Sequence, residues 1–400
     1  MNRAMTTEPV ELYRLRFRFS PPPFISHAES RVKLHVEVIN ECGHGISAIT
    51  AHPNTPLVQG WVIAVRPCDP VTFVPMSIAE STVVMAPHQR HATIYVFLPN
   101  SCSPLRFHAQ LHSNNATSAH ATMSLQSFTC GASMGTHGHV LVLPVWSNTI
   151  VRTQPSSNDT LASVATCLRR FSIQRPTDQV PSLITVEERY GDAMASHVWD
   201  AGICLSYFLQ TYHLPQLSQP LHAMEIASGS GLLGLVLATL LPPHSTLVLT
   251  DKPSNLDLLG YNVRQHQSTR PSPLCSVAVC SLEWGNAVHL EALLAPHNPP
   301  HLLLLADVLY NWAAHPQLWA TVAAIATPLT TIFLAHKHRA ATSTAALRHL
   351  HVHGTCPSCS LSSTIPSTCG WQQGLWKLEL RASFGSTDIF QLVIQHHLST

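Results

Sequence analysis

The sequence predicts a two-part protein, with a Rossmann-like α/β fold in the C-terminal half and a small all-β domain before it. The chain has 400 residues, more than the ~100–200 that are usual for one domain. Up to about residue 150, short apolar runs are separated by Pro, Gly, Asn and Ser, which is typical of a sandwich or barrel. After about residue 182, helical patterns alternate with short apolar runs, as in α/β proteins. We therefore predict a β domain at 1–150, a linker at 151–181 and an α/β domain at 182–400.

The strands predicted in residues 1–150 come from alternating apolar and polar side chains. In Val32–Val38 every second residue is apolar, which places the apolar side chains on one face of a half-buried strand. Further strands are predicted at Leu12–Phe19, Trp61–Val65, Thr82–Met85, Thr93–Leu98, Leu105–Leu111 and Val140–Val145. The segment 151–181 is polar and contains Pro155 and Pro176, so we interpret it as a linker with one short helix at Leu161–Arg170.

Residues 182–400 contain continuous apolar runs, which are typical of parallel strands buried on both faces. Strands are predicted at His222–Ile226, Thr246–Thr250, Ser276–Cys280, His301–Leu305 and Thr331–Ala335. Helices are predicted at Val198–Thr211, Gly231–Leu241, Asn255–His266 and Pro316–Ala326. The last two strands, Trp376–Ser383 and Ile389–Gln395, would complete the sheet as a hairpin.

Composition excludes several kinds of partner. The 22 basic and 21 acidic residues leave a net charge of +1, which does not build the positive field that nonspecific nucleic-acid binding requires. The longest apolar stretch, Leu232–Leu241, is too short to span a membrane. Eleven scattered cysteines are typical of reduced thiols, so we expect the cytosol or nucleus. Oligomeric state is not visible in the sequence.

A glycine loop follows the predicted strand His222–Ile226. Gly229, Gly231 and Gly234 match the spacing G-x-G-x-x-G between a strand and a helix. Asp251 follows the next strand, where a carboxylate accepts hydrogen bonds from ribose hydroxyls. This pattern predicts a nucleotide site and fits both NAD and S-adenosylmethionine.

Four segments resemble the class I, seven-β-strand methyltransferases, and more narrowly their protein-lysine branch, which modifies chaperones and translation factors. The first segment, Gly191–Gly202, contains Val-Trp-Asp, and the second, Met224–Gly234, contains the glycine loop. The third, Leu282–Gly285, is a Leu-x-Trp-Gly motif, and the fourth, Ala306–Tyr310, contains Asp-x-x-Tyr. Their order and spacing agree with that family over residues 182–400, whereas 1–150 are not covered. The resemblance implies S-adenosyl-L-methionine as cofactor and a protein lysine as methyl acceptor.

The resemblance also implies roles for individual residues. Glu225 would lie near the methionine amino group and Trp199 near the methionine end of the cofactor. Asp251 would hold the ribose and Trp284 would cover the adenine. Asp307 and Tyr310 would line the passage in which the acceptor amine meets the methyl group. The predicted cofactor-binding residues are Trp199, Glu225, Ala227, Gly229, Gly231, Asp251, Trp284 and Asp307; the predicted catalytic residues are Asp307 and Tyr310.

One position departs from the family pattern. The family usually has glycine where this chain has Ala227, and a side chain disfavours positive φ. Because Gly229 and Gly231 remain, we expect Ala227 at negative φ and an intact cofactor site.

Metal and histidine sites are less well supported. His351, His353, Cys356 and Cys359 are zinc-ligand types at plausible spacing, but only one Cys-x-x-Cys pair occurs, so we expect a loop and no metal. His197 is the histidine nearest to the motifs, although its spacing does not mark it as catalytic.

Other functions share the same loop. One is a methyltransferase that acts on a protein histidine or a small molecule. A second is a catalytically inactive binding protein that kept the fold, and the departure from glycine at Ala227 is the observation that suggests it. A third is an NAD-dependent oxidoreductase, which the glycine loop and Asp251 also fit.

Overall fold

The computed structural model describes residues 5–6, 11–26, 28–42, 61–86, 89–99, 103–111, 125–130, 133–134, 140–153, 165–175, 179–190, 194–214, 219–269, 275–339, 341–353 and 376–394. The chain forms two compact units. The α/β unit comprises Met1–Pro9, Ile173–Ile184 and Val198–Thr400. The β unit comprises Val10–Ser172 and Thr185–His197. Thus Met5 and Thr6 belong to the same unit as the described strands near residue 390.

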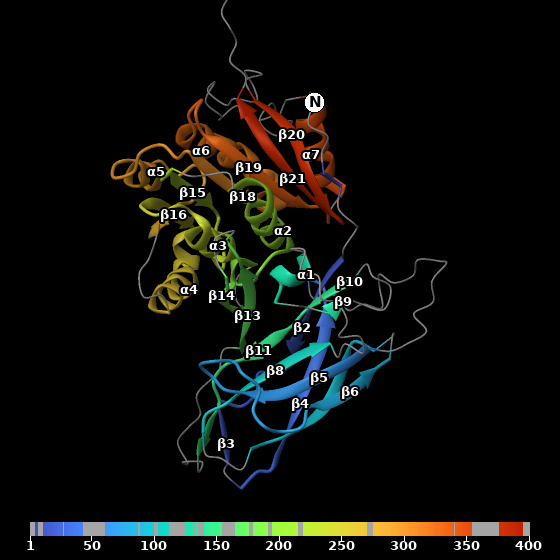
Figure 1. Ribbon diagram of the computed structural model, residues 1–400. Coiled ribbons are helices and arrows are strands. Elements are labelled where there is room, and N and C mark those ends of the chain that lie inside the picture. Colours follow the sequence, from blue (N-terminus) through green and yellow to red (C-terminus); the bar gives the residue numbers. More distant parts are fainter. Residues whose placement is uncertain are drawn as a thin grey trace, which may run out of the picture. The chain divides into compact units, whose positions relative to one another are not determined.

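The α/β unit is built on a mixed sheet with the order β1-β20-β21-β19-β18-β15-β16-β17 (Figure 1). Its strands are β1 (Met5–Thr6), β15 (His222–Ile226), β16 (Ser245–Asp251), β17 (Cys275–Ser281), β18 (Leu302–Ala306), β19 (Thr331–Lys337), β20 (Trp376–Phe384) and β21 (Thr387–Ile394). Strands β15 to β19 are parallel, and β21 pairs antiparallel with both β19 and β20. Because β15 lies between β16 and β18, the strand order reverses there, where ligands bind in doubly wound sheets.

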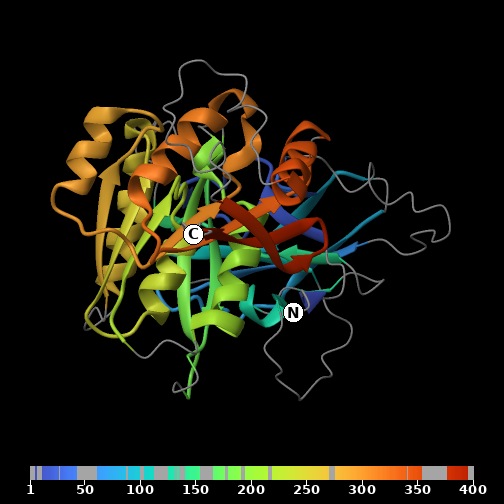
Figure 2. The ribbon, with the colours of Figure 1, turned by 90° about the horizontal axis from the view of Figure 1, so that it is seen from above.

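Helices cover both faces of this sheet (Figure 2). On one face α5 (Ala287–Leu294), α6 (His315–Ile325) and α7 (Ala341–His353) share a hydrophobic core with the strands. On the other face lie α2 (Asp200–Phe208), α3 (Leu232–Leu240) and α4 (Leu256–Ser268). Short turns of helix are η2 (Met194–Ser196), η3 (Leu209–His213), η5 (Pro253–Asn255), η6 (Val308–Tyr310) and η7 (Trp312–Ala314). The continuous apolar sequences of β15 and β18 are explained by this double burial.

The β unit is a sandwich. One sheet has the order β7-β4-β2-β10-β9 and the other β14-β13-β11-β8-β5-β6, while β12 pairs with β3 alone. Side chains of both larger sheets, such as Leu15, Val36, Ile63 and Phe107, meet in one core. The elements are β2 (Glu11–Phe17), β3 (Phe24–Ser26), β4 (Arg31–Ile39), β5 (Trp61–Cys68), β6 (Ser81–Met85), β7 (His91–Phe97), β8 (Arg106–Leu111), α1 (Leu125–Phe128), β9 (Ser133–Met134), β10 (Val140–Leu143), β11 (Val145–Ser147), β12 (Val151–Thr153), β13 (Ala165–Ile173) and β14 (Ser182–Tyr190).

The helix predicted at Leu161–Arg170 is wrong, because residues from Ala165 onward form the strand β13. The predicted linker therefore contains a central strand of the sandwich. Arg169 in β13 is fully buried, and its Nε lies 2.7 Å from Glu188 Oε2 in β14. A buried guanidinium requires such a partner, and a partner 19 residues away is not visible in a local pattern.

The strand predicted at Val140–Val145 is instead two strands, β10 and β11, which belong to different sheets. The other predicted strands and helices named above are present, with shifts of a few residues at their ends. Helices α1, α5 and α7 and strands β1, β3, β9, β12 and β14 were not predicted. Among the described residues, no helix is long and apolar enough to cross a membrane. All cysteines in the described part of the chain are free.

Candidate functional site

The glycine loop connects β15 to α3 and contains three residues at positive φ. These are Ala227 at 58°, Gly229 at 54° and Gly231 at 87°. The expectation that Ala227 has negative φ is therefore wrong. The Ser228 amide donates to the Thr250 carbonyl at 2.8 Å, and this bond fixes the turn beside β16. Ala227 thus holds the left-handed conformation that glycine adopts more readily.

Asp251 fastens this loop to the end of β16. Its Oδ2 accepts a hydrogen bond from the Gly229 amide at 2.8 Å. Its Oδ1 accepts from the Lys252 amide at 2.8 Å and from Asn255 Nδ2 at 2.7 Å. A carboxylate accepts about four hydrogen bonds, so these three leave room for about one more from a ligand hydroxyl.

Glu225 is a buried carboxyl beneath the loop. Its side chain is 2% exposed, and Oε2 has no hydrogen-bond partner among the described residues. Burial raises its pKa to about 8, and the negative charge of Asp251 adds to the rise. A Cβ on Gly234 of α3 would lie 3.0 Å from Oε2, so glycine here leaves room for the carboxyl. A buried acceptor without a partner fits a cationic ligand group, such as the ammonium of a methionine moiety.

Asp307 follows β18 and is also left-handed, with φ 61° and ψ 28°. Arg339, just beyond β19, donates to both of its oxygens, with 2.8 Å from Nη1 to Oδ1. The same guanidinium lies 5.1 Å from the centre of the Trp199 ring. Asp307 is therefore bound by an arginine, which the sequence did not predict.

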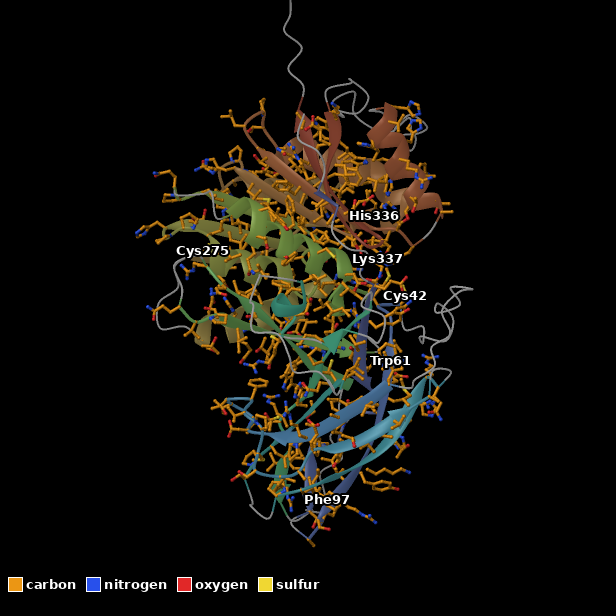
Figure 3. The ribbon with its side chains drawn as sticks, turned by 45° about the vertical axis from the view of Figure 1, so that its right-hand side comes forward. Cys42, Trp61, Phe97, Cys275, His336 and Lys337 are labelled. Atoms are coloured by element: carbon orange, nitrogen blue, oxygen red, sulfur yellow. The ribbon has the colours of Figure 1, made fainter. Side chains whose placement is uncertain are left out.

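Two neighbours of Arg339 on β19 extend this network (Figure 3). Lys337 Nζ donates to Asp200 Oδ2 at the start of α2. His336 is 1% exposed, and its Nδ1 lies 3.7 Å from Asp307 Oδ1. Burial, with smaller effects of nearby cations and imidazoles, lowers the pKa of His336 to about 3. His336 is thus neutral beside Asp307 over the physiological range.

Trp284 and Tyr310 form the aromatic part of the site. Their ring centres lie 6.4 Å apart, although one follows β17 and the other ends η6. Partial burial, and then the negative charge of Asp251, raise the pKa of Tyr310. Tyr310 keeps 58% of its surface exposed and is accessible to a ligand.

The structure thus places most of the predicted residues at the carboxyl ends of neighbouring strands, where the order reverses. His197 belongs to the β unit, where its ring lies 5.1 Å from that of Tyr190. His351 Nδ1 is bonded to the Leu378 carbonyl oxygen at 2.9 Å, and Cys356 and Cys359 lie outside the described residues. Arg339, Lys337 and Asp200 were missed as site residues. A basic residue after a strand, such as Arg339, usually indicates only a solvated turn, and the Lys337–Asp200 pair joins residues 137 positions apart, which no local pattern shows.

The fold and the glycine loop define a Rossmann-like α/β domain. Residues 179–352 match the family model described as lysine methyltransferase. Similar proteins include EEF1A lysine methyltransferase 3 of Xenopus tropicalis, 30% identical over 158 residues (39% of this chain, 64% of that protein). METTL21E of Bos taurus, named a protein-lysine methyltransferase, is 35% identical over 127 residues (32% and 41%). EFM7 of Cryptococcus neoformans, named a protein N-terminal and lysine N-methyltransferase, is 32% identical over 139 residues (34% and 44%).

These matches span 64% of the frog protein, 41% of the bovine protein and 44% of the fungal protein. Similar solved structures include an O-methyltransferase family protein from Burkholderia thailandensis, with 15% identity and a TM-score of 0.32 over 49% of this chain and 59% of that one. The S-adenosylmethionine-dependent methyltransferase SibL has 13% identity and a TM-score of 0.30 over 48% and 57%.

Proposed function

We propose that this protein is an S-adenosylmethionine-dependent methyltransferase that modifies a lysine side chain of a protein substrate. The observation that carries the proposal is the pair of carboxyl groups at adjacent strand ends. Glu225 offers a buried acceptor without a partner, and Asp251 keeps about one acceptor position beside the loop. An aminoacid-nucleoside carries both an ammonium and ribose hydroxyls, so it matches both groups.

Different residues of the domain would bind different parts of this cofactor. Glu225 would hold the ammonium, Asp251 a ribose hydroxyl, and Trp284 the adenine face. When bound, the cofactor supplies a methyl group on a positively charged sulfur. The positive φ of Gly229 and Gly231 lets the backbone approach the nucleoside closely. A Cβ at Gly231 would also lie 2.8 Å from Leu259 Cδ1, so the loop has no room for a side chain there.

The acceptor amine must be neutral to attack the methyl carbon, whereas a free lysine has a pKa near 10.4. Arg339 and Lys337 place two cationic groups at this end of β19. Each is paired with a carboxylate, Arg339 with Asp307 and Lys337 with Asp200, so these carboxylates offer an entering lysine ammonium little net negative charge, which favours the neutral amine. Asp307 and Tyr310 would then orient the neutral amine, since alignment supplies much of the rate in such displacements.

The substrate class is inferred from the relatives. Two of the three are named for lysine methylation of proteins in general, and the frog protein is named for EEF1A. We therefore propose a translation factor as the substrate and the cytosol or nucleus as the compartment. The left-handed Ala227 keeps the inactive binding protein as the competing hypothesis.

The first test is calorimetric titration with S-adenosylhomocysteine, with NADH as control. We expect micromolar binding of S-adenosylhomocysteine alone, and weaker binding by Glu225→Gln. If the protein were an NAD-dependent dehydrogenase, NADH alone would bind. Binding of neither would support an inactive fold.

Transfer is tested next with methyl-labelled cofactor and purified translation factors. Label should enter a lysine of the factor, as located by mass spectrometry. Label on a histidine or on a small molecule in a lysate would identify the other methyltransferase classes. Cofactor binding without any transfer would reject translation factors as the substrate class.

A further inference from the structure

The outer face of the six-stranded sheet in the β unit carries a row of basic and aromatic side chains. Arg66 of β5 pairs with His108 of β8, and His108 pairs with Trp146 of β11. Side chains alternate along a strand, so Arg106 lies on the same face as His108. By the same rule, Arg170 lies on the face of Leu168, which pairs with Trp146. The opposite face holds core residues.

Phe73 lies between two of these guanidinium groups. Its ring centre is 4.0 Å from the Arg170 guanidinium carbon and 5.1 Å from that of Arg106. The Trp146 ring meets the Phe73 ring edge to face at 6.3 Å and stacks on His108 at 4.3 Å. Phe73 has φ 61°, which is an outlier for a bulky residue. The contacts with the two arginines and Trp146 thus outweigh the cost of this backbone conformation.

One guanidinium group of this row, that of Arg170, is not neutralised within the described residues. Arg66 has Glu80 at 3.7 Å, and Arg106 donates to the uncharged carbonyls of Pro70 and Ser147. Arg170 has no carboxylate partner in the part of the chain that the structure describes. Burial lowers the pKa of Arg170, which shows that its charge is partly removed from water. A partly buried cation without an anion is stabilised when an anion binds.

A buried indole N–H adds to this picture. Trp146 is 5% exposed, and its Nε1 has no hydrogen-bond partner among the described residues. His108 is 7% exposed and stacks on this ring, and burial lowers its pKa to about 3, so the imidazole is neutral. An unmet donor beside three arginines favours an acceptor-rich ligand.

Two classes of anionic macromolecule differ in what they require. Single-stranded nucleic acid binds by stacking bases on exposed aromatic faces. Here the Trp146 ring is buried and the Phe73 ring is already flanked by two guanidinium groups. Carboxylates need only the guanidinium fork, and Val71 and Val74 beside Phe73 expose apolar surface at 81% and 59%. The surface therefore fits an acidic peptide that also carries apolar side chains.

We propose that this face of the β unit, the arginine–aromatic surface of Arg66, Phe73, Arg106, His108, Trp146 and Arg170, binds an acidic segment of a partner protein. Arg170 is the main anchor, because it has no carboxylate partner among the described residues, and Arg66 supports it although Glu80 lies 3.7 Å away. The surface acts independently of the cofactor site, so the proposal stands or fails without the methyltransferase activity.

The test is fluorescence anisotropy with a fluorescein-labelled peptide of alternating glutamate and leucine, in the absence of cofactor. The comparison ligands are a lysine–leucine peptide and a labelled oligo(dT). We expect the acidic peptide to bind most tightly and to weaken as NaCl rises. Arg170→Gln should weaken binding about tenfold, since a charge-assisted hydrogen bond is lost.

Matched variants separate binding from folding. Arg31 also stacks on an aromatic ring, at 5.1 Å from the Tyr95 centre, but lies on β4 of the other sheet. Arg31→Gln should leave the affinity unchanged, and Arg170→Lys should keep most of it. Equal affinity of wild type and Arg170→Gln, in protein with an unchanged circular dichroism spectrum, would overturn the proposal. Tighter binding of oligo(dT) than of the acidic peptide would also overturn it. Should Arg170→Gln misfold, Arg66→Gln makes the same test.

Discussion

Ala227 and Asp307 both hold left-handed conformations at the ends of parallel strands, yet neither is glycine. Asp tolerates this region because its short polar side chain bonds locally, whereas Ala has no such compensation. Ala227 therefore carries a conformational cost at the centre of the glycine loop. The cost limits stability, but the loop still presents its amides to Asp251.

Replacing Ala227 by Gly should stabilise the α/β unit by about 1 kcal/mol, because it removes the left-handed penalty. The measurement is the urea midpoint of unfolding. The control is Ala324→Gly, which makes the same chemical change on the exposed side of α6 and should destabilise by about 0.5–1 kcal/mol. Equal losses in both variants would show that Ala227 is unstrained.

Arg339 should set the pH dependence of the proposed reaction. Its charge near Asp307 favours a neutral acceptor amine, so Arg339→Gln should move the rising limb of kcat/KM toward higher pH by about one unit. Initial rates between pH 6.5 and 9.5 measure this. Arg339→Lys keeps the charge and should keep the limb in place. A uniform loss at every pH would instead mean that Arg339 only holds Asp307 in position.

Contact between β16 and α3 depends on a glycine. A Cβ at Gly234 would lie 2.3 Å from Leu249 Cδ2, so the helix lies against the strand without a spacer. This is the role of the third glycine in the loop pattern. The arrangement also leaves room for the Glu225 carboxyl beneath the helix.

The variant Gly234→Ala should destabilise the α/β unit by about 1–3 kcal/mol, because the added methyl group overpacks this contact. Thermal unfolding followed by circular dichroism measures the effect. Gly202→Ala in α2 is the control, since nothing lies within 4 Å of its Cβ position. It should stabilise slightly through helix propensity. A harmless Gly234→Ala would mean that α3 shifts freely on β16.

How far the fold could be predicted depended on where each element finds its partners. Strands β15 and β18 were predictable because burial on both faces makes them wholly apolar. Strand β13 was not, because its buried Arg169 is paired with Glu188 of another strand. The positions of Asp251 and Asp307 at the site followed from the strand ends. The Arg339–Asp307 pair did not, because it depends on how β19 ends beside β18.

The two units should respond differently to acid. His108 in the β unit has a pKa of about 3, against 6.5 for a free histidine. Below about pH 6.5 this histidine therefore binds a proton in the unfolded chain but not in the folded unit. The free energy of unfolding consequently decreases as the pH falls. In the α/β unit His336 acts in the same direction. Glu225 acts oppositely, because its raised pKa of about 8 gives stability that is lost as pH rises from 4.5 to 8.

Lowering the pH from 7 to 5 should therefore destabilise the β unit by about 2 kcal/mol, whereas in the α/β unit the opposite effects of His336 and Glu225 roughly cancel. Differential scanning calorimetry at both pH values should show the transition of the β unit moving to lower temperature. In His108→Gln this transition should move less. An unchanged acid response in that variant would show that another group in the β unit is responsible.

Strand β1 is only two residues long, but it pairs with β20 near the far end of the chain. During synthesis, Met5 and Thr6 leave the ribosome long before their partner strand, which follows some 380 residues later. In the meantime the β sandwich between them has the time to fold alone. A recombinant fragment that starts at residue 182 would lack this strand and leave the edge of β20 open to pairing with other molecules. Aggregation of such a fragment would reflect a missing neighbour rather than an unstable domain.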